Sequence, residues 1–191
     1  MPDTPEQLLN LVFDENSQLA IEFYQAYGRA LSAWARIETN LGYQFHSITN
    51  TRIEIALPVF YSARNFNGRT DMLGAALKNS EVSEDFKICL RAAIKKAVSY
   101  NGFRNLIAHG QPALHFWPGQ RQKDRMVLSQ GKADEPEVWS TLITVTHLLN
   151  AAHNFSALAG LIFDVGDPSE RLLPQLRALP ALPHSSSEAP E

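Results

Sequence analysis

The residues best suited to chemistry lie in one short stretch, 101–112, which reads Asn-Gly-Phe-Arg-Asn-Leu-Ile-Ala-His-Gly-Gln-Pro. Arg104, Asn105 and His109 fall within six consecutive positions of it. A histidine side chain takes up and releases a proton near neutral pH, and an arginine side chain holds an anion through paired hydrogen bonds. Burying either without a partner is costly, so the packed end of an apolar helix gains nothing from them. We therefore interpret these residues as candidates for chemistry.

A long helix predicted over residues 84–108 must position this stretch. Ser83, followed by acidic residues, is typical of a helix N-cap. Gly110 and Pro112 are typical of a helix end. The inner stripe, at three- and four-residue steps, consists of Phe86, Leu90, Ala93, Ala97, Tyr100 or Asn101, Arg104 and Ala108. This spacing predicts that Arg104 continues the core-facing line of the helix.

The positions of Arg104 and His109 raise a geometric difficulty. They are five residues apart, which is about 140° around an ideal helix. Their side chains would not converge on an unbroken helix. Either a frayed end before Gly110 or a second subunit is needed to bring the two groups together, and the sequence leaves both open.

Three other stretches show the apolar spacing of helices: residues 17–46, 53–78 and 135–164. Pro58 falls in the first turns of the second stretch or kinks it, and Pro136 suits the first turn of the last. The apolar stripe of the first stretch consists of Leu19, Phe23, Ala26, Ala30, Ala33, Trp34, Ile37 and Leu41.

Residues 111–134 have a different character from the helical stretches. Two short β-prone runs, 112–117 and 125–130, flank a Pro-Gly pair and a basic turn, a pattern that predicts a hairpin. We expect Trp117 to cover the core, with stacking on a nucleic-acid base as the alternative.

These elements predict an all-α fold, namely an antiparallel four-helix bundle with a small β-hairpin-like insertion between the third and fourth helices. The 191 residues suit one domain. We expect residues 1–16 to form a lead-in and residues 17–166 to form the bundle, with the insertion at 111–134. Residues 167–191 are expected to form a tail, flexible beyond about residue 179.

Further polar residues are candidates for a supporting role. Glu38 falls on or beside the apolar stripe of its helix, so it is either a flank residue in water or the partner of a buried cation. Arg64, Arg69 and Asp71 belong to a polar run within the second helical stretch. That run predicts either a solvated helix face or a polar cluster lining a cleft.

The charge distribution is uneven. The net charge is −3, yet residues 52–132 hold 13 Lys and Arg against 6 Asp and Glu. A basic middle that contains the Arg–His stretch is compatible with a polyanionic partner such as RNA. The first residues lack the pattern of a secretory signal, so we expect a cytoplasmic location.

Several other chemistries are poorly supported. The single cysteine, Cys89, excludes an internal disulfide and a multi-cysteine metal site, and its neighbours indicate a core position. His147 and His153 are six apart, which is not the spacing of two metal ligands on one helical face. They also argue against a membrane span over residues 142–165. No Gly-rich phosphate loop or nucleophile-turn motif occurs. We expect no metal and no cofactor.

The motif Arg104-Asn105-Leu-Ile-Ala-His109, with Gly110 after it, resembles that of the HEPN superfamily. Its signature is an Arg, a polar residue that is often Asn, three to five variable residues and a His. The predicted order of helices is similar too, with the motif closing the third long helix. The resemblance covers roughly residues 17–164.

The resemblance implies a metal-independent endoribonuclease that acts as a homodimer, such as a toxin paired with an antitoxin protein or a phage-defence effector. His109 would act as general acid or base, and Arg104 would stabilise phosphate charge. Asn105 would hold the imidazole or a phosphate oxygen. The competing class is a non-catalytic HEPN-like module that dimerises or binds a partner protein, with Arg104 and His109 capping their helix. We favour the enzyme.

Overall fold

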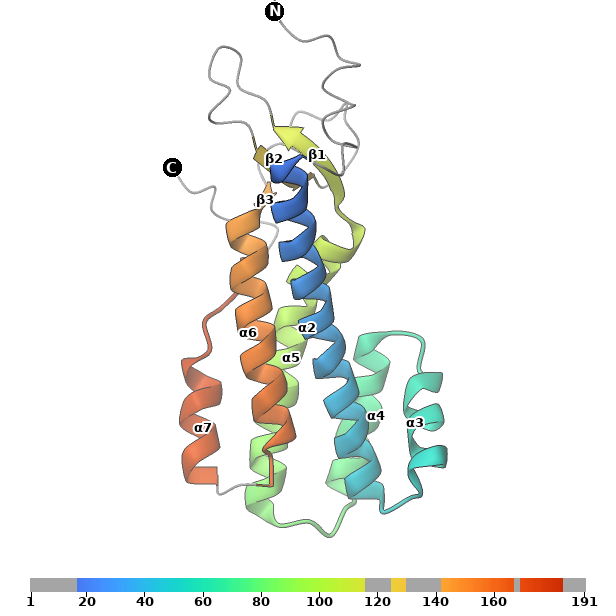
Figure 1. Cartoon of the computed structure of the whole chain (residues 1–191). Coiled ribbons are helices and arrows are strands. Elements are labelled where there is room, and N and C mark those ends of the chain that lie inside the picture. The colour runs from blue at the N-terminus through green and yellow to red at the C-terminus, as the bar shows by residue number, and fades with distance from the viewer. Residues whose placement is uncertain (1–16, 116–124, 130–141, 167–168, 184–191) are drawn as a thin grey trace, which may run out of the picture. The chain divides into compact units, whose positions relative to one another are not determined.

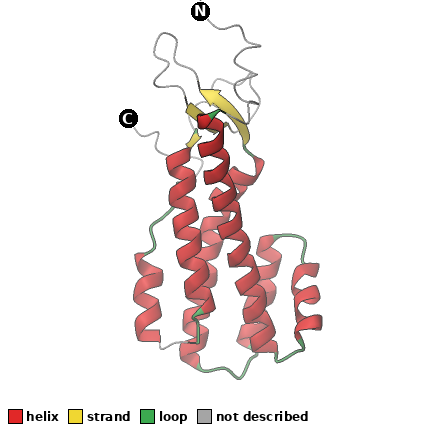
Figure 2. Cartoon of the chain, viewed as in Figure 1, coloured by secondary structure: helices red, strands yellow, loops and turns green. Residues whose placement is uncertain are grey.

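The computed structural model describes residues 17–115, 125–129, 142–166 and 169–183. These residues are predominantly helical with a small antiparallel sheet, which confirms the predicted class (Figures 1 and 2). The helices within these ranges are α2 (Gln18–Thr49), α3 (Ile53–Ser62), α4 (Phe66–Lys78), α5 (Glu84–His109), α6 (Val145–Phe163) and α7 (Ser169–Ala178). The strands are β1 (Gln111–His115), β2 (Arg125–Ser129) and β3 (Ile143–Thr144).

The chain divides into two compact units. Among the described residues, unit 1 comprises 17–31, 103–115, 125–129, 142–152 and 183. Unit 2 comprises residues 32–102, 153–166 and 169–182. Helices α2, α5 and α6 each contribute one part to each unit.

Unit 1 contains the sheet, in the order β1-β2-β3. Strands β1 and β2 are antiparallel, with Gln111 opposite Ser129 and His115 opposite Arg125, so the predicted hairpin is confirmed in its described part. Among the described strands β1 lies at an edge of the sheet, a position in which proline is tolerated. Trp117 lies outside the described residues.

The fourth helix begins later than predicted. The prediction placed its start near residue 135, whereas α6 starts at Val145. Residues 135–141 lie outside the described ranges, and Ile143 and Thr144 pair with β2 as strand β3. Both residues are β-branched, and such side chains favour the pleated, half-buried surface of a sheet.

The buried line of α5 also differs from the prediction. Phe103 and Ile107 are buried within unit 1, whereas Arg104 and Ala108 are half-buried. The large apolar side chains of adjacent positions therefore fill the core, and Arg104 lies at its margin. The other buried residues that the helices give to unit 1 are Ala20, Phe23, Ala26, Ala30, Leu148 and Ala151.

In unit 2, the second predicted helix is two helices. It breaks after Ser62, and α4 begins at Phe66 with Asn65 as N-cap, whose Oδ1 accepts a hydrogen bond from Gly68 N at 2.7 Å. Pro58 lies inside α3 and does not mark the break. The polar run that begins at Arg64 thus contains a cap, which explains part of its polarity.

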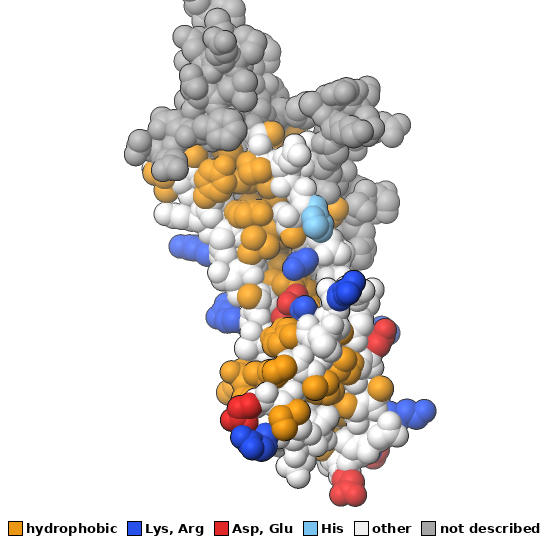
Figure 3. Space-filling view, turned by 90° about the vertical axis from the view of Figure 1, so that its right-hand side faces the viewer, with side chains coloured by type: hydrophobic (Ala, Val, Ile, Leu, Met, Phe, Trp, Pro, Cys, Tyr) orange, Lys and Arg blue, Asp and Glu red, His pale blue; other side chains and the backbone are white. Residues whose placement is uncertain are grey.

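Helix α3 packs closely on α2 but leaves apolar side chains exposed. Gly42 permits the close approach, since a Cβ there would lie 3.1 Å from Leu57 Cδ2. Ala56 and Phe60 are buried. Figure 3 shows hydrophobic side chains gathered over α3, and those exposed on this helix are Ile53, Ile55, Val59 and Tyr61.

Residues 169–178, predicted to lie in the tail, form α7. Leu172 and Leu176 are buried, as is Leu182 beyond the helix. Lys96 Nζ donates to the carbonyl of Leu179, and Tyr100 Oη donates to that of Pro180 at 2.8 Å. Burial raises the pKa of Tyr100 to about 12, so the phenol keeps its proton and remains a donor. The chain is therefore held as far as residue 182.

Candidate functional site

The candidate motif lies at the end of α5, in the part of that helix belonging to unit 1. The predicted N-cap of the helix is confirmed, because Ser83 Oγ accepts from Phe86 N at 3.2 Å. At the other end, Gly110 N donates to Leu106 O at 3.0 Å, which continues the helical pattern by one residue. Strand β1 then starts at Gln111. The motif is thus followed directly by the sheet.

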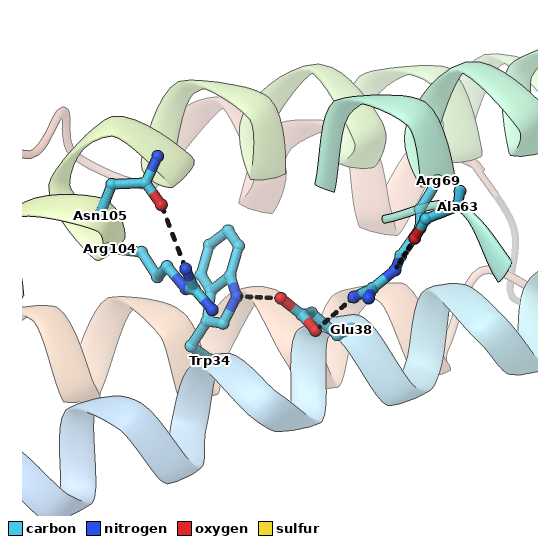
Figure 4. A network of polar contacts seen from close by, with 6 residues as sticks. All are labelled: Trp34, Glu38, Ala63, Arg69, Arg104 and Asn105. Atoms are coloured by element: carbon cyan, nitrogen blue, oxygen red, sulfur yellow. Dashed lines mark hydrogen bonds and ion pairs between the residues drawn. The ribbon is translucent and has the colours of Figure 1, made fainter. Parts of the chain in front are cut away.

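Arg104 and Asn105 are brought together by the structure. Arg104 Nη1 donates to Asn105 Oδ1 at 3.1 Å (Figure 4). Arg104 is half-buried and Asn105 is exposed. The amide oxygen therefore orients one edge of the guanidinium near the surface of unit 1, which is the kind of fixed geometry that recognition of an anion needs.

His109 is exposed in the last turn of the same helix. The helix is regular through His109, so the frayed end that the sequence left open is absent from this part of α5. An unbroken helix turns by about 140° over five residues. Within one chain, Arg104 and His109 therefore point from different sides of α5. Completion of the site by a second subunit remains a prediction.

The supporting residues predicted from the sequence all belong to unit 2. Glu38 and Arg69 form an ion pair, with 2.8 Å between Oε2 and Nη1 (Figure 4). Their side chains are 19% and 18% exposed, so the pair is largely removed from water. Of the two roles that the sequence allowed for Glu38, partner of a cation is confirmed. Arg64 and Asp71 are exposed.

Further contacts make Glu38 a structural connection within unit 2. Its Oε1 accepts from Trp34 Nε1 at 2.6 Å, and Arg69 Nε donates to Ala63 O at 3.2 Å. The Trp34 ring packs against Phe66, with 4.8 Å between centroids. The network ties α2 to the α3–α4 connection and to α4. Sequence reasoning named Glu38 and Arg69 without pairing them, and it did not assign Trp34 a polar role.

The two histidines of α6 differ in their surroundings. His153 is exposed, whereas His147 is half-buried next to Thr144. Burial and the positive charge of Arg125 lower the pKa of His147. The contact between Thr144 and His147 has a recognisable sequence pattern. A threonine stands at the start of a helix, and a side chain able to accept a hydrogen bond follows three residues later.

Comparison of the chain with known proteins gives no relative from which residue roles could be transferred. No protein-family model, curated protein or solved structure matches the chain. Within the described ranges, no three His, Cys, Asp or Glu side chains gather in a way that could hold a metal ion. None of the helices in those ranges is long and apolar enough to cross a lipid bilayer.

Proposed function

We propose that this protein is a metal-independent endoribonuclease of the HEPN type, built on a HEPN-like four-helix bundle. The observation that carries the proposal is the arrangement at the end of α5. There, a half-buried Arg104 is oriented by Asn105, and His109 is exposed five residues further on. The resemblance of this motif to the HEPN signature supports the assignment, and the basic middle of the chain supports an RNA substrate.

The chemistry follows from the residue types. Attack of an RNA 2′-OH on the adjacent phosphorus forms a 2′,3′-cyclic phosphate and expels the 5′-oxygen of the next nucleotide. His109 removes the proton from the 2′-OH or gives one to the leaving oxygen. Arg104 stabilises the charge that builds up on the phosphoryl oxygens. Both contributions are larger in the transition state than in the ground state.

The proposed enzyme acts as a homodimer. In one chain, the two groups emerge from different sides of α5 because the helix is unbroken between them. Two copies related by a two-fold axis present two motifs to one another, so that Arg104 of one copy faces His109 of the next. This arrangement supplies both groups to one phosphate without distorting the helix.

The test is RNA cleavage in the presence of EDTA. We expect His109→Ala and Arg104→Ala each to reduce the cleavage rate at least about 100-fold, the usual effect of losing a general acid–base group or a charge-stabilising donor. Arg91→Ala and His153→Ala are matched controls, because both residues are exposed and lie outside the motif. They should cut RNA at the wild-type rate. Full activity in either motif variant, with circular dichroism unchanged, would exclude this mechanism.

The alternative is a non-catalytic HEPN-like module that dimerises or binds a partner protein. The exposed apolar side chains of α3 favour it, since contiguous apolar surface is typical of interaction sites. Under this alternative, the wild-type protein cuts no RNA. Ile55→Asp, at a position 52% exposed, would weaken self-association in analytical ultracentrifugation without unfolding the chain.

A further inference from the structure

His147 lies at the junction between the sheet and α6, in unit 1. Thr144 pairs with Val127 of β2 and directly precedes Val145, the first residue of α6. The backbone N–H of Thr144 donates to His147 Nδ1 at 3.2 Å, and Thr144 Oγ1 lies 3.2 Å from the same atom. This contact has the geometry of a capping box, in which the third helical residue accepts from the N-cap amide.

The contact fixes the protonation state of the ring. A backbone amide nitrogen can only donate, so Nδ1 must be the acceptor and the ring proton must lie on Nε2. A doubly protonated imidazolium has no acceptor left. Its charge would also sit in the first turn of α6, where the helix dipole disfavours a cation.

The charge of Arg125 acts in the same direction. Between Val145 and Phe163, α6 contains no Asp, Glu, Lys or Arg. Arg125 of β2 acts on the ring, and its positive charge adds to the effect of burial in lowering the pKa of His147. Unit 1 contains further ionisable residues whose side chains the structure describes. They are Glu22, Tyr24, Tyr27 and Arg29 on α2, and Arg104 and His109 on α5.

We propose that His147 is an acid-sensitive switch that couples α6 to the sheet of unit 1. Protonation removes the acceptor for Thr144 N–H, so the first turn of α6 separates from β3 and the pairing of β3 with β2 loosens. The sheet leads directly into the candidate motif, because β1 starts two residues after His109. Mild acid would therefore loosen the sheet that continues the α5 terminus.

Acid reduces the contribution of His147 to stability. Because the pKa of His147 is lowered by folding, the unfolded chain binds the proton more readily than the folded chain. The contribution of His147 to the free energy of unfolding is therefore complete above about pH 6.5, the ordinary value for histidine. It decreases as the pH falls below that value.

The test is amide hydrogen exchange of the wild-type protein and of His147→Gln at about pH 7.5 and about pH 5, compared at equal pH. Glutamine keeps an acceptor at the third helical position and does not titrate. In the wild type, protection at 144–148 should fall about fivefold more between the two pH values than in His147→Gln, the effect of losing a cap worth about 1 kcal/mol. Equal pH dependence in both proteins would overturn the proposal.

A second measurement needs no variant, so it tests the proposal even if His147→Gln fails to fold. Nitrogen chemical shifts of the His147 ring in the wild-type protein report its tautomer directly. We expect an unprotonated Nδ1 near neutral pH, and a titration that coincides with the loss of protection at 144–148. A proton on Nδ1 near neutral pH, or a titration without any change in protection, would refute the switch.

Discussion

At the scale of single residues, two Arg–Glu ion pairs of unit 2 differ in their surroundings. The Arg69–Glu38 pair has side chains 18% and 19% exposed, whereas the Arg52–Glu54 pair has 79% and 66%. Exposed pairs contribute little because water already solvates both charges and the side chains lose freedom. The Arg69–Glu38 pair is shielded from water, and Glu38 also accepts a hydrogen bond from Trp34. Water cannot easily take the place of either contact.

We predict that Glu38→Gln lowers the free energy of unfolding by about 1–3 kcal/mol, because a shielded guanidinium loses its counter-charge while the amide still accepts from Trp34. Arg52→Met is the matched control and should change it by less than about 0.5 kcal/mol. Urea denaturation of both variants measures the difference. Equal effects would mean that the Glu38 network does not contribute to stability as its contacts indicate.

At the scale of the elements, two glycines of α2 give opposite expectations. A Cβ at Gly28 would have no neighbour within 4 Å, whereas at Gly42 it would meet Leu57 Cδ2 at 3.1 Å and Phe60 Cδ1 at 3.3 Å. Gly28→Ala should raise the free energy of unfolding by about 0.5–1 kcal/mol, since alanine favours a helix. Gly42→Ala should gain less, because α3 must shift. Thermal unfolding of both variants tests this, and a larger gain for Gly42→Ala would contradict the packing.

The helices that the sequence predicts well are those with a long apolar period. Residues 17–46 and 84–108 were predicted close to the bounds of α2 and α5. The break before Asn65 was missed because the polar run around it reads equally well as a solvated helix face. Helix α7 was missed because Pro174 lies inside it and obscures the four-residue spacing of Leu172 and Leu176.

The sequence also placed Arg104 one position wrongly around its helix. Phe103 is three residues after Tyr100 and Arg104 is four, so both fit the spacing of one helical face. Tertiary packing selects the aromatic ring for the core, and the guanidinium remains at the margin. Spacing alone cannot make this choice, because positions three and four residues after Tyr100 both lie on its side of the helix.

At the scale of the whole molecule, the predicted site divides into two groups. Arg104 and Asn105 are adjacent in the sequence and are predicted together. Their side chains form a hydrogen bond in the structure. Glu38 and Arg69 are 31 positions apart, and no sequence period relates one helix to another at that distance. Their pairing follows from tertiary structure alone. The role that we propose for His109 needs a second copy of the chain, which one sequence does not describe.

In the proposed reaction the RNA 2′-OH is the nucleophile, with His109 of one copy as general acid or base and Arg104 of the other copy stabilising the phosphoryl charge. The most direct measurement uses an oligoribonucleotide cut by the protein in EDTA, together with the same oligomer carrying a single 2′-deoxynucleotide on the 5′ side of the cleaved bond. We predict a 2′,3′-cyclic phosphate product from the first substrate and no cleavage at that bond in the second. Cleavage of the deoxy-substituted bond, or a 3′-hydroxyl product, would contradict the proposed function.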